Sequence, residues 1–526
     1  MASTLLKDNS TYSYKTESKA LIELLTGNNS QTSLAFEKTL ANLKADRFLI
    51  EPNYVDKDYL EDYANFYARC FQDYNRFCKR LHFFKGNNKR GEKFSFSNRL
   101  LKKIWTEGLD DKTLYSLQDN YLGFIVLKPA KNGFMLGRTC IRHYEEDEER
   151  NRRYHAKRDY SVNLYGIELK VQSMAFQEQD ETVAVCASIA LWSAFNITGK
   201  RFQHRIPSPS EVTKLALSET SYMRSFPSIG LSQQQMGVAV SKLGLNPLLV
   251  GLKQHRNIKS HIYAYLKAGI PLICGLSLYN ELEKDGKVVI DENSKSYHAV
   301  TINGFSFEGG EGELPMSDGL RLLTSRMTQF YVHDDQLCPF TKMEFDNSYC
   351  KIGESTGQKV STTWHAPKPT AKKKYKEHKV AIIEGLIIPL YHKIRISYHD
   401  ILDEVQGFSS KLDLLMKELS TLTGSDFQYF EWEIFLTEVG DFKKDILSQP
   451  DVIDREKILK KGYAKYLWRA RAITIGWLDT DSRNRKTELE LIFDATDSKK
   501  KGISKEIIYY NPIIKMGADF YPKILI

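Results

Sequence analysis

The chain has 526 residues, of which 42% are hydrophobic and 12% aromatic, so it is long enough for two to four domains with buried cores. Its 75 basic and 66 acidic residues give a net charge of +9, which is mild for this length and does not favour a nucleic-acid-binding protein. Because no apolar run reaches about 18 residues and the start MASTLLKDNS lacks a basic and then apolar signal pattern, we expect a soluble, cytoplasmic protein without a membrane partner.

Seven cysteines are spread along the chain without any Cys-x-x-Cys pair. The sequence therefore predicts neither a disulfide framework nor a structural zinc site. We expect most of the cysteines to be small core residues, including Cys70 and Cys78 on the apolar stripe of a helix and Cys274 in the run PLICGL.

Residues 1–159 are expected to form a mostly helical N-terminal region with one β-hairpin. The clearest helix spans about 57–83, where apolar and aromatic side chains recur at steps of three and four. The β-rich segments YLGFIVLKP and GFMLGRTCI flank the turn-prone PAKNG and predict the hairpin. The mixed-charge segment EEDEERNRRYHAKRD that follows is typical of an exposed connector.

Residues 160–345 place helices first and strands second, which indicates an α+β unit. We expect helices beginning near Cys186, at PSPSEV, in GLSQQQMGVAVSKLGL and at HIYAYLKAGI. In the third of these, Ser232 and Gln235 fit a capping box and Gly244 fits the end. PLICGLSL, HAVTINGF and QFYVHDD predict three strands.

The last third of the chain is expected to contain a linker, 346–379, and a C-terminal α+β domain, 380–526, for substrate or partner recognition. The domain shows a helix around 399–421 and the strand-like TELELIFDATD. Lysine runs at 372–379 and 499–501 predict solvated loops, because no aromatic residues are interleaved with them; nucleic acid is not an expected partner.

Three residue types that support thiol catalysis occur in a fitting order. The polar segment QEQDET precedes Cys186, His298 opens the alternating segment YHAVTINGF, and Asp334 and Asp335 end FYVHDD. A cysteine thiolate attacks a carbonyl, a histidine accepts and returns the proton, and a carboxylate orients the histidine. The start of a helix and a nearby imidazolium both favour the thiolate.

An oxyanion hole is expected beside this nucleophile. The backbone N–H of Cys186 is one candidate donor, and the side-chain amide of Gln179, seven residues earlier, is the second, with Gln177 in reserve. Loss of one such donor costs about 3 kcal/mol of transition-state stabilisation.

Each residue also has an ordinary interpretation: Cys186 as a buried structural thiol, His298 as a strand residue, and either aspartate as a turn carboxylate. A metal site built from His333, Asp334, Asp335 and Cys338 matches no closed zinc pattern. We therefore expect neither a metal nor a cofactor.

The segment 160–345 resembles the papain-like cysteine peptidases, most closely the bacterial leader-peptidase-like group. Four stretches carry the resemblance: FQEQDETVAVCASIALW, SIGLSQQQMGVAVSKLGL, LKAGIPLICGL, and YHAVTINGF with FYVHDDQ. It implies a core in which N-terminal helices pack on an antiparallel sheet, with the site in the cleft between. By this similarity Cys186 is the nucleophile, His298 the base, Asp334 the orienting acid and Gln179 the oxyanion donor.

The sequence departs from that family at the site. Gln179 stands one residue farther from the cysteine than in papain, Val-Cys-Ala replaces Asp-Cys-Gly, and Asp-Asp-Gln replaces Asp-Pro. The last change leaves the third residue open between Asp334 and Asp335.

The expected function is an intracellular thiol protease that hydrolyses a peptide or isopeptide bond in a protein or peptide substrate. Two alternatives remain. One is acyl transfer to an amine by the same triad, as in transglutaminase-like chemistry. The other is a catalytically silent scaffold that binds a protein partner through residues 380–526.

Overall fold

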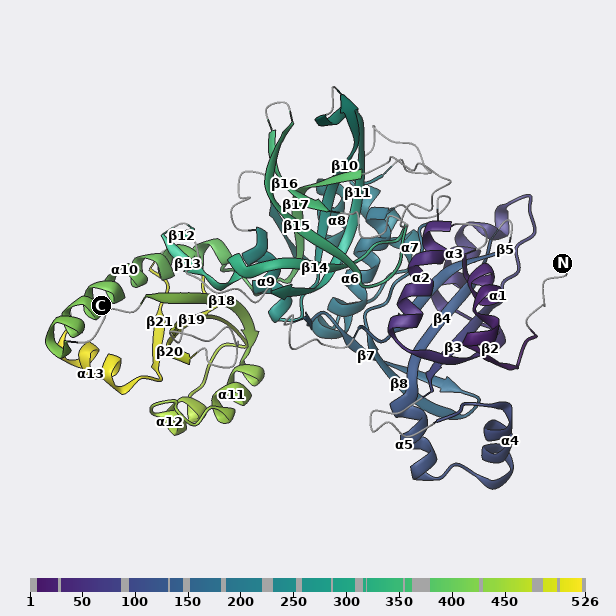
Figure 1. The fold of residues 1–526 in the computed structure, drawn as a ribbon, viewed down its shortest axis with the longest axis horizontal. Helices are drawn as coiled ribbons and strands as arrows, with labels where there is room; N and C mark the ends of the chain where they lie inside the picture. Colours follow the sequence, from purple (N-terminus) through teal and green to yellow (C-terminus); the bar gives the residue numbers. More distant parts are fainter. Residues whose placement is uncertain are drawn as a thin grey trace.

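The computed structural model describes residues 7–26, 30–86, 94–130, 133–144, 152–180, 186–219, 230–251, 258–284, 287–307, 316–317, 319–352, 355–361, 379–424, 429–474, 486–498 and 502–522. Helices and largely antiparallel sheets alternate along the chain, so the expected α+β class is confirmed. Three larger sheets follow one another along the long axis of the molecule, with the N-terminal sheet at the right of Figure 1 and the C-terminal sheet at the left.

The N-terminal sheet has the order β1-β2-β3-β4-β5 and is covered by helices. Its strands are β1 (Thr11–Ser13), β2 (Ala45–Tyr54), β3 (Cys78–Lys85), β4 (Tyr121–Ala130) and β5 (Gly133–Ile141). The helices of this region are α1 (Tyr14–Thr26), α2 (Ser30–Asn42), α3 (Lys57–Asn65), α4 (Asn98–Glu107) and α5 (Asp111–Asn120). The expected hairpin is present as β4 and β5, but the region also contains β2 and β3, which the sequence analysis did not predict.

The helix predicted over 57–83 is wrong beyond Asn65, where α3 ends. The second half of that segment instead enters β3, which pairs with β2 and β4. Nearly every side chain of β3 is buried, including those of Arg80 and His82, so the segment CKRLHFFK shows no period-two alternation that would mark a strand. Cys78 and Leu81, three positions apart, instead favour a helix. Pairing on both sides decides the outcome. Cys78 is accordingly a buried strand residue, whereas Cys70 is exposed.

The central sheet closes on itself. Its strands are β6 (Arg153–Tyr154), β9 (Leu245–Val250), β10 (Leu272–Lys284), β11 (Lys287–Phe307), β14 (Met327–His333), β15 (Thr341–Ile352), β16 (Ser355–Ser361) and β17 (Lys379–Tyr391). Pairing runs β10-β11-β14-β15-β16-β17, and β17 pairs again with β10 to complete a barrel. Register shifts, including one between Gly275 and Leu276, supply the bending that closure requires.

The linker predicted over 346–379 is replaced by strands wherever the structure describes it: β15 and β16 extend to Ser361, and β17 begins at Lys379. Side chains at 341–346 alternate between buried and partly exposed, so the segment carries a period-two pattern that its Lys, Ser and Thr content obscured. Residues 362–378 and the lysine run 499–501 lie outside the described residues.

Four helices precede or flank the barrel strands as predicted: α6 (Cys186–Phe202), α7 (Pro209–Leu217), α8 (Gln233–Lys242) and α9 (Ile258–Lys267). The capping box is confirmed, since Ser232 Oγ accepts from the Gln235 backbone N–H and Gln235 Oε1 accepts from the Ser232 N–H. Helix α6 packs against β11, and the Thr301 hydroxyl donates to the Ala190 carbonyl at 2.7 Å. A separate hairpin of β7 (Arg158–Leu164) and β8 (Ile167–Ser173) precedes α6.

The C-terminal sheet has the order β12-β13-β18-β19-β20-β21. Its strands are β12 (Met316–Ser317), β13 (Leu320–Leu322), β18 (Phe430–Glu438), β19 (Tyr466–Thr474), β20 (Lys486–Asp494) and β21 (Lys505–Tyr509), with helices α10 (Tyr398–Thr423), α11 (Val439–Ser448), α12 (Arg455–Lys460) and α13 (Pro512–Phe520). Strand β13 comes from the connection between β11 and β14 and pairs parallel to β18, so the barrel and this sheet share chain segments.

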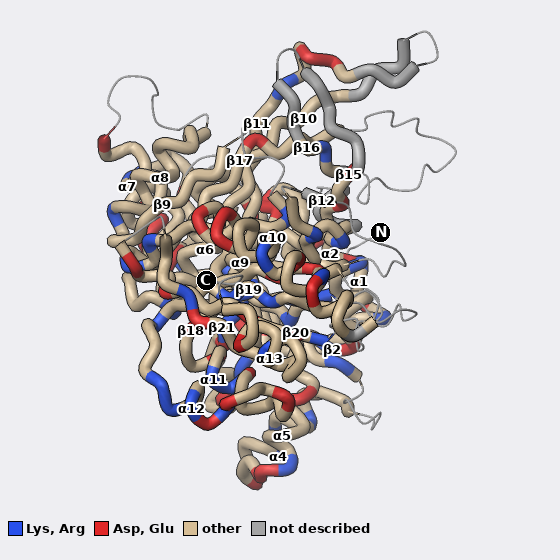
Figure 2. The backbone as a smooth tube through the Cα atoms, turned by 90° about the vertical axis from the view of Figure 1, so that its left-hand side faces the viewer, with Lys and Arg blue, Asp and Glu red and all other residues tan. Residues whose placement is uncertain are grey.

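Charged side chains of both signs are interspersed along the chain, as the coloured tube in Figure 2 shows for α10 and α12. On α12, for example, Lys460 pairs with Glu456 one turn away. In the described parts of the chain, none of the helices is both long enough and apolar enough to cross a bilayer.

Candidate active site

The register of two neighbouring strands brings His298 and Asp334 together. Thr301 of β11 is paired with His333 of β14. One step further along each antiparallel strand, Asp334 comes level with Val300, only two positions from His298. Strand pairing thus joins two residues that are 36 positions apart in the sequence.

His298 and Asp334 form a buried hydrogen-bonded pair. His298 Nε2 lies 3.0 Å from Asp334 Oδ1, and the two residues are 6% and 5% exposed. Burial opposes protonation of the ring, but the Asp334 carboxylate outweighs it and raises the pKa of His298 well above its usual value. The backbone N–H of Gln336 also donates to Asp334 Oδ1 at 3.1 Å, which helps to fix the carboxylate.

Cys186 is the first residue of α6 and is partly exposed. Its thiol is close enough to the His298 ring to act as a hydrogen-bonding partner that favours the protonated imidazole. Since Nε2 is taken by Asp334, Nδ1 is the nitrogen left for the thiol. This nitrogen is buried and has no partner of full hydrogen-bond geometry among the described residues, so the contact is loose, as is common before substrate binds.

Asp335 is a second carboxyl group at the same imidazole. Its Oδ1 lies 3.7 Å from His298 Nε2, and both of its carboxyl oxygens are buried without a hydrogen-bond donor in the described part of the chain. Burial raises the pKa of Asp335 to about 7; the His298 ring opposes the rise and Asp334 adds to it. Asp334 is therefore the direct partner of the ring, and Asp335 holds a proton close to neutral pH.

The glutamine-bearing loop reaches the same place through its backbone. The N–H of Gln179 donates to the carbonyl of Asp335 at 3.3 Å, and the Gln179 side chain is partly exposed. Gln177 is 3% exposed, and its amide nitrogen has no hydrogen-bond partner among the described residues. Residues 181–185, which join the loop to Cys186, lie outside the described residues.

A buried polar cluster, which the sequence analysis missed, anchors this loop to the N-terminal region. Asp180 accepts a hydrogen bond from the Tyr67 hydroxyl and lies 3.8 Å from the ammonium group of Lys128 on β4. Glu178 accepts from the backbone N–H of Leu136 on β5 at 3.1 Å. The described part of the loop is thus fixed by contacts with two strands of the N-terminal sheet.

The ligand-type atoms of His298, Asp334 and Asp335 lie within 4.8 Å of one another, which is close enough for a metal ion. The raised pKa of Asp335 favours a carboxyl group that keeps its proton, and a protonated oxygen is a poor ligand. His333 and Cys338, also considered from the sequence, do not join this group; Cys338 Sγ instead contacts the Thr341 hydroxyl at 3.3 Å.

Searches for related proteins return no match to this chain, either among family models or among curated proteins.

Proposed function

We propose that the chain is a papain-like thiol hydrolase that cleaves a peptide or isopeptide bond, with Cys186 as nucleophile, His298 as base and Asp334 as orienting carboxylate. One observation carries the proposal: the buried His298 ring is hydrogen-bonded through Nε2 to the Asp334 carboxylate, and Cys186, the first described residue of α6, is among the groups that raise the pKa of this ring. A thiol needs these two neighbours, a helix start and an imidazolium, to react at neutral pH.

In the first step the Cys186 sulfur attacks the substrate carbonyl and His298, holding the proton at Nδ1, passes it to the departing amine. The C–N bond breaks and an acyl-thioester forms. Water then gives a proton to Nδ1 as it attacks the thioester, and the proton returns to sulfur when the thiol leaves. Asp334 keeps the ring oriented and stabilises its protonated form throughout.

The oxyanion of each tetrahedral intermediate is stabilised by hydrogen-bond donors beside Cys186. Backbone N–H groups at the start of a helix have no intrahelical partners, and we assign the first donor to the backbone N–H of Cys186. We assign the second donor to the Gln179 side chain, because the backbone of this residue already contacts Asp335 and its side chain is partly exposed.

We place the activity in a reducing compartment, the cytoplasm, since the six described cysteines are all free thiols. The thioester could also be resolved by an amine instead of water. Ammonia release from a glutamine-containing peptide, without chain cleavage, would identify that acyl-transfer variant of the reaction.

The proposal is tested by alkylating the protein with iodoacetamide from pH 5 to 9 and locating the label by peptide mass mapping. Cys70 is an exposed cysteine outside the site and is the internal reference, because an unassisted thiol reacts mainly above about pH 8. At pH 6 we expect Cys186 to be labelled faster than Cys70. In His298→Ala this difference in labelling rate should disappear.

Two variants complete the test. Cys186→Ala should remove labelling by an electrophilic peptide probe and leave the fold unchanged. Cys70→Ser should still be labelled by the probe. Equal pH profiles for Cys186 and Cys70 would contradict the proposal and favour a catalytically silent scaffold.

A further inference from the structure

A cavity of about 500 Å³ lies between the barrel and the C-terminal sheet. On the barrel side it is lined by His155, by Tyr263 and Lys267 of α9, and by Phe305 of β11. On the other side it is lined by residues of β18, β19 and β20 and of the segment after α11. Small-molecule sites commonly have this size and occur at such interfaces. Phe305 is seven residues beyond His298 on β11, so the cavity lies roughly 20 Å along that strand from His298.

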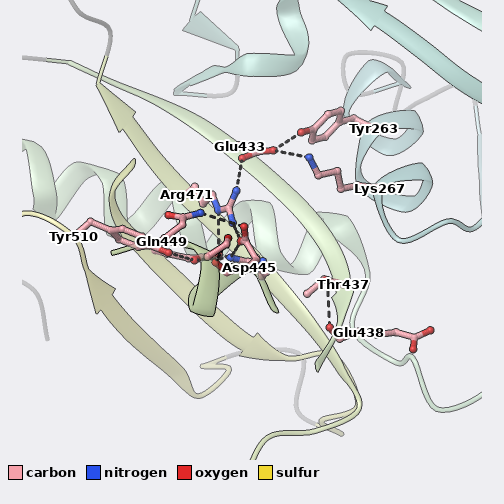
Figure 3. A network of polar contacts seen from close by, with 12 residues as sticks. Tyr263, Lys267, Glu433, Thr437, Glu438, Asp445, Gln449, Arg471 and Tyr510 are labelled. Carbon is pink, nitrogen blue, oxygen red and sulfur yellow. Dashed lines mark hydrogen bonds and ion pairs between the residues drawn. The ribbon is translucent and has the colours of Figure 1, made fainter. Parts of the chain in front are cut away.

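The carboxylate of Glu433 on β18 is already fully engaged. It accepts a hydrogen bond from the Tyr263 hydroxyl and faces Lys267 at 3.6 Å and Arg471 at 3.5 Å, as Figure 3 shows. Arg471 is in turn paired with Asp445 and lies 3.4 Å from Glu490. These contacts join the two units across the cavity and neutralise Glu433, the carboxylate that lines it from β18.

The ionic side chains of the lining are predominantly basic. Among the described residues, the ion pair of Lys267 is the loose 3.6 Å contact with Glu433, and its ammonium group also lies over the rings of Tyr263 and Phe435. An ammonium group carries three hydrogen-bond donors. The basic side chains that line the cavity are Arg153, Lys267, Arg471 and Lys486, and the acidic ones are Glu433 and Asp451. Lys486 and Asp451 are both exposed to solvent and contribute little. Arg471 is already paired with Asp445 and Glu490. Among the described lining residues that are not fully exposed, this leaves Arg153 and Lys267 as cations beside the single carboxylate of Glu433.

His155 supplies an unused polar atom at the same place. Its ring stacks on Phe305 with centroids 5.5 Å apart, and its Nε2 is buried without a hydrogen-bond partner among the described residues. Burial, and then the positive charges of Lys267, Lys157 and Arg153, lower the pKa of His155 to about 3. The ring is therefore neutral and sits in a region of positive potential, which an anion would compensate.

We propose that this cavity binds a small molecule through an anionic group, a phosphate or a carboxylate, held by Arg153, Lys267 and Nε2 of His155. The site is separate from the thiol centre, so it does not depend on the proposed hydrolase activity. The anion accepts charge-assisted hydrogen bonds from the two cations and a hydrogen bond from the imidazole.

The test is isothermal titration of the full chain with inorganic phosphate and with citrate at constant ionic strength, with glycerol as the neutral reference. We expect saturable binding of at least one anion. Arg153→Gln and Lys267→Gln should each weaken it about tenfold or more. Lys460→Gln, which removes an exposed charge on α12, is the matched control and should bind as the parent does.

A second readout places the anion. In protein labelled with ¹³C-histidine, the His155 resonance, assigned by its loss in His155→Gln, should shift saturably with the same anion. A response to phosphate alone identifies a phosphate-bearing ligand, and a response to citrate alone a carboxylate. The proposal is overturned if neither anion gives a saturable signal up to about 10 mM, or if Arg153→Gln and Lys267→Gln both bind as the parent does.

Discussion

The indole N–H of Trp192 donates a 3.1 Å hydrogen bond to the buried carboxylate of Asp58. Trp192 lies on α6, the helix that Cys186 begins, and Asp58 lies on α3 in the N-terminal region. Arg138 of β5 pairs with the same carboxylate at 3.2 Å. The helix of the candidate nucleophile is thereby fixed to the N-terminal sheet, as is the loop that precedes it, so this region supports the site directly.

We therefore predict that Tyr67→Phe slows labelling of Cys186 by more than its loss of stability accounts for. The variant removes the hydroxyl that donates to Asp180 and leaves that buried carboxylate with Lys128 at 3.8 Å. The expected loss is about 1–3 kcal/mol in the free energy of unfolding, together with slower labelling of Cys186. Tyr59→Phe is the matched control, since that neighbouring hydroxyl donates to the Asn75 carbonyl and not to Asp180. Equal labelling rates in the two variants would show that the loop does not depend on Asp180.

Asp334 and Asp335 should differ in their effect on thiol reactivity. Removing Asp334 takes away the carboxylate that raises the pKa of His298, so the imidazolium and the thiolate beside it lose their stabilisation. Asp334→Ala should slow alkylation of Cys186 at pH 6 about tenfold or more, and Asp335→Ala much less. The reverse ranking would assign the orienting role to Asp335.

The pH dependence of stability should report Asp335. Its pKa is raised from the ordinary 3.8 to about 7, so the folded state binds this proton more tightly than the unfolded state does. The stabilising contribution is complete below pH 3.8 and is lost as the pH rises through about 7. The free energy of unfolding of Asp335→Asn, relative to that of the parent, should therefore increase as the pH rises from 4 to 8, by at most about 4 kcal/mol.

Urea denaturation of the parent and of Asp335→Asn at pH 4 and pH 8 measures how the difference between their free energies of unfolding changes with pH. His298 contributes to both proteins with the same sign, because its pKa is also raised and its stabilisation also declines at high pH. A relative stability that does not change with pH would mean that Asp335 is ionised throughout.

Gln179 should matter for acylation and not for alkylation. Attack on p-nitrophenyl acetate forms an oxyanion, whereas displacement of iodide from iodoacetamide does not. Gln179→Ala should slow nitrophenol release roughly 100-fold and leave alkylation of Cys186 unchanged. The same pair of measurements on Gln177→Ala gives the comparison; an acylation defect confined to that variant would transfer the donor role to Gln177.

Local patterns were sufficient to predict the elements that carry the proposed site. The helix at Cys186, the capping box at Ser232 and the strands that carry His298 and Asp334 all occur where the sequence analysis placed them. These elements have distinct signals: a cap, a regular period, or a turn-forming boundary.

The missed features depend on contacts between distant segments. Strand β3 was taken for a helix because its apolar residues continue the three- and four-residue spacing of the preceding segment. Strands β15 and β16 were taken for a linker because they are polar. The cluster around Lys128 could not be predicted because a lone lysine in an apolar strand gives no sign of the acidic loop that it meets. The preference for Asp334 over Asp335 comes from a 3.0 Å distance against 3.7 Å, which no sequence pattern encodes.

Closure of the barrel by β17 also has a consequence for synthesis of the protein. A nascent chain that has emerged only to Asp335 already contains Cys186 and His298, yet it lacks the strand that pairs with β10 and completes the ring. The barrel can therefore close only after the ribosome has passed Tyr391, the last residue of β17. Until then, the strand that carries His298 belongs to an open sheet.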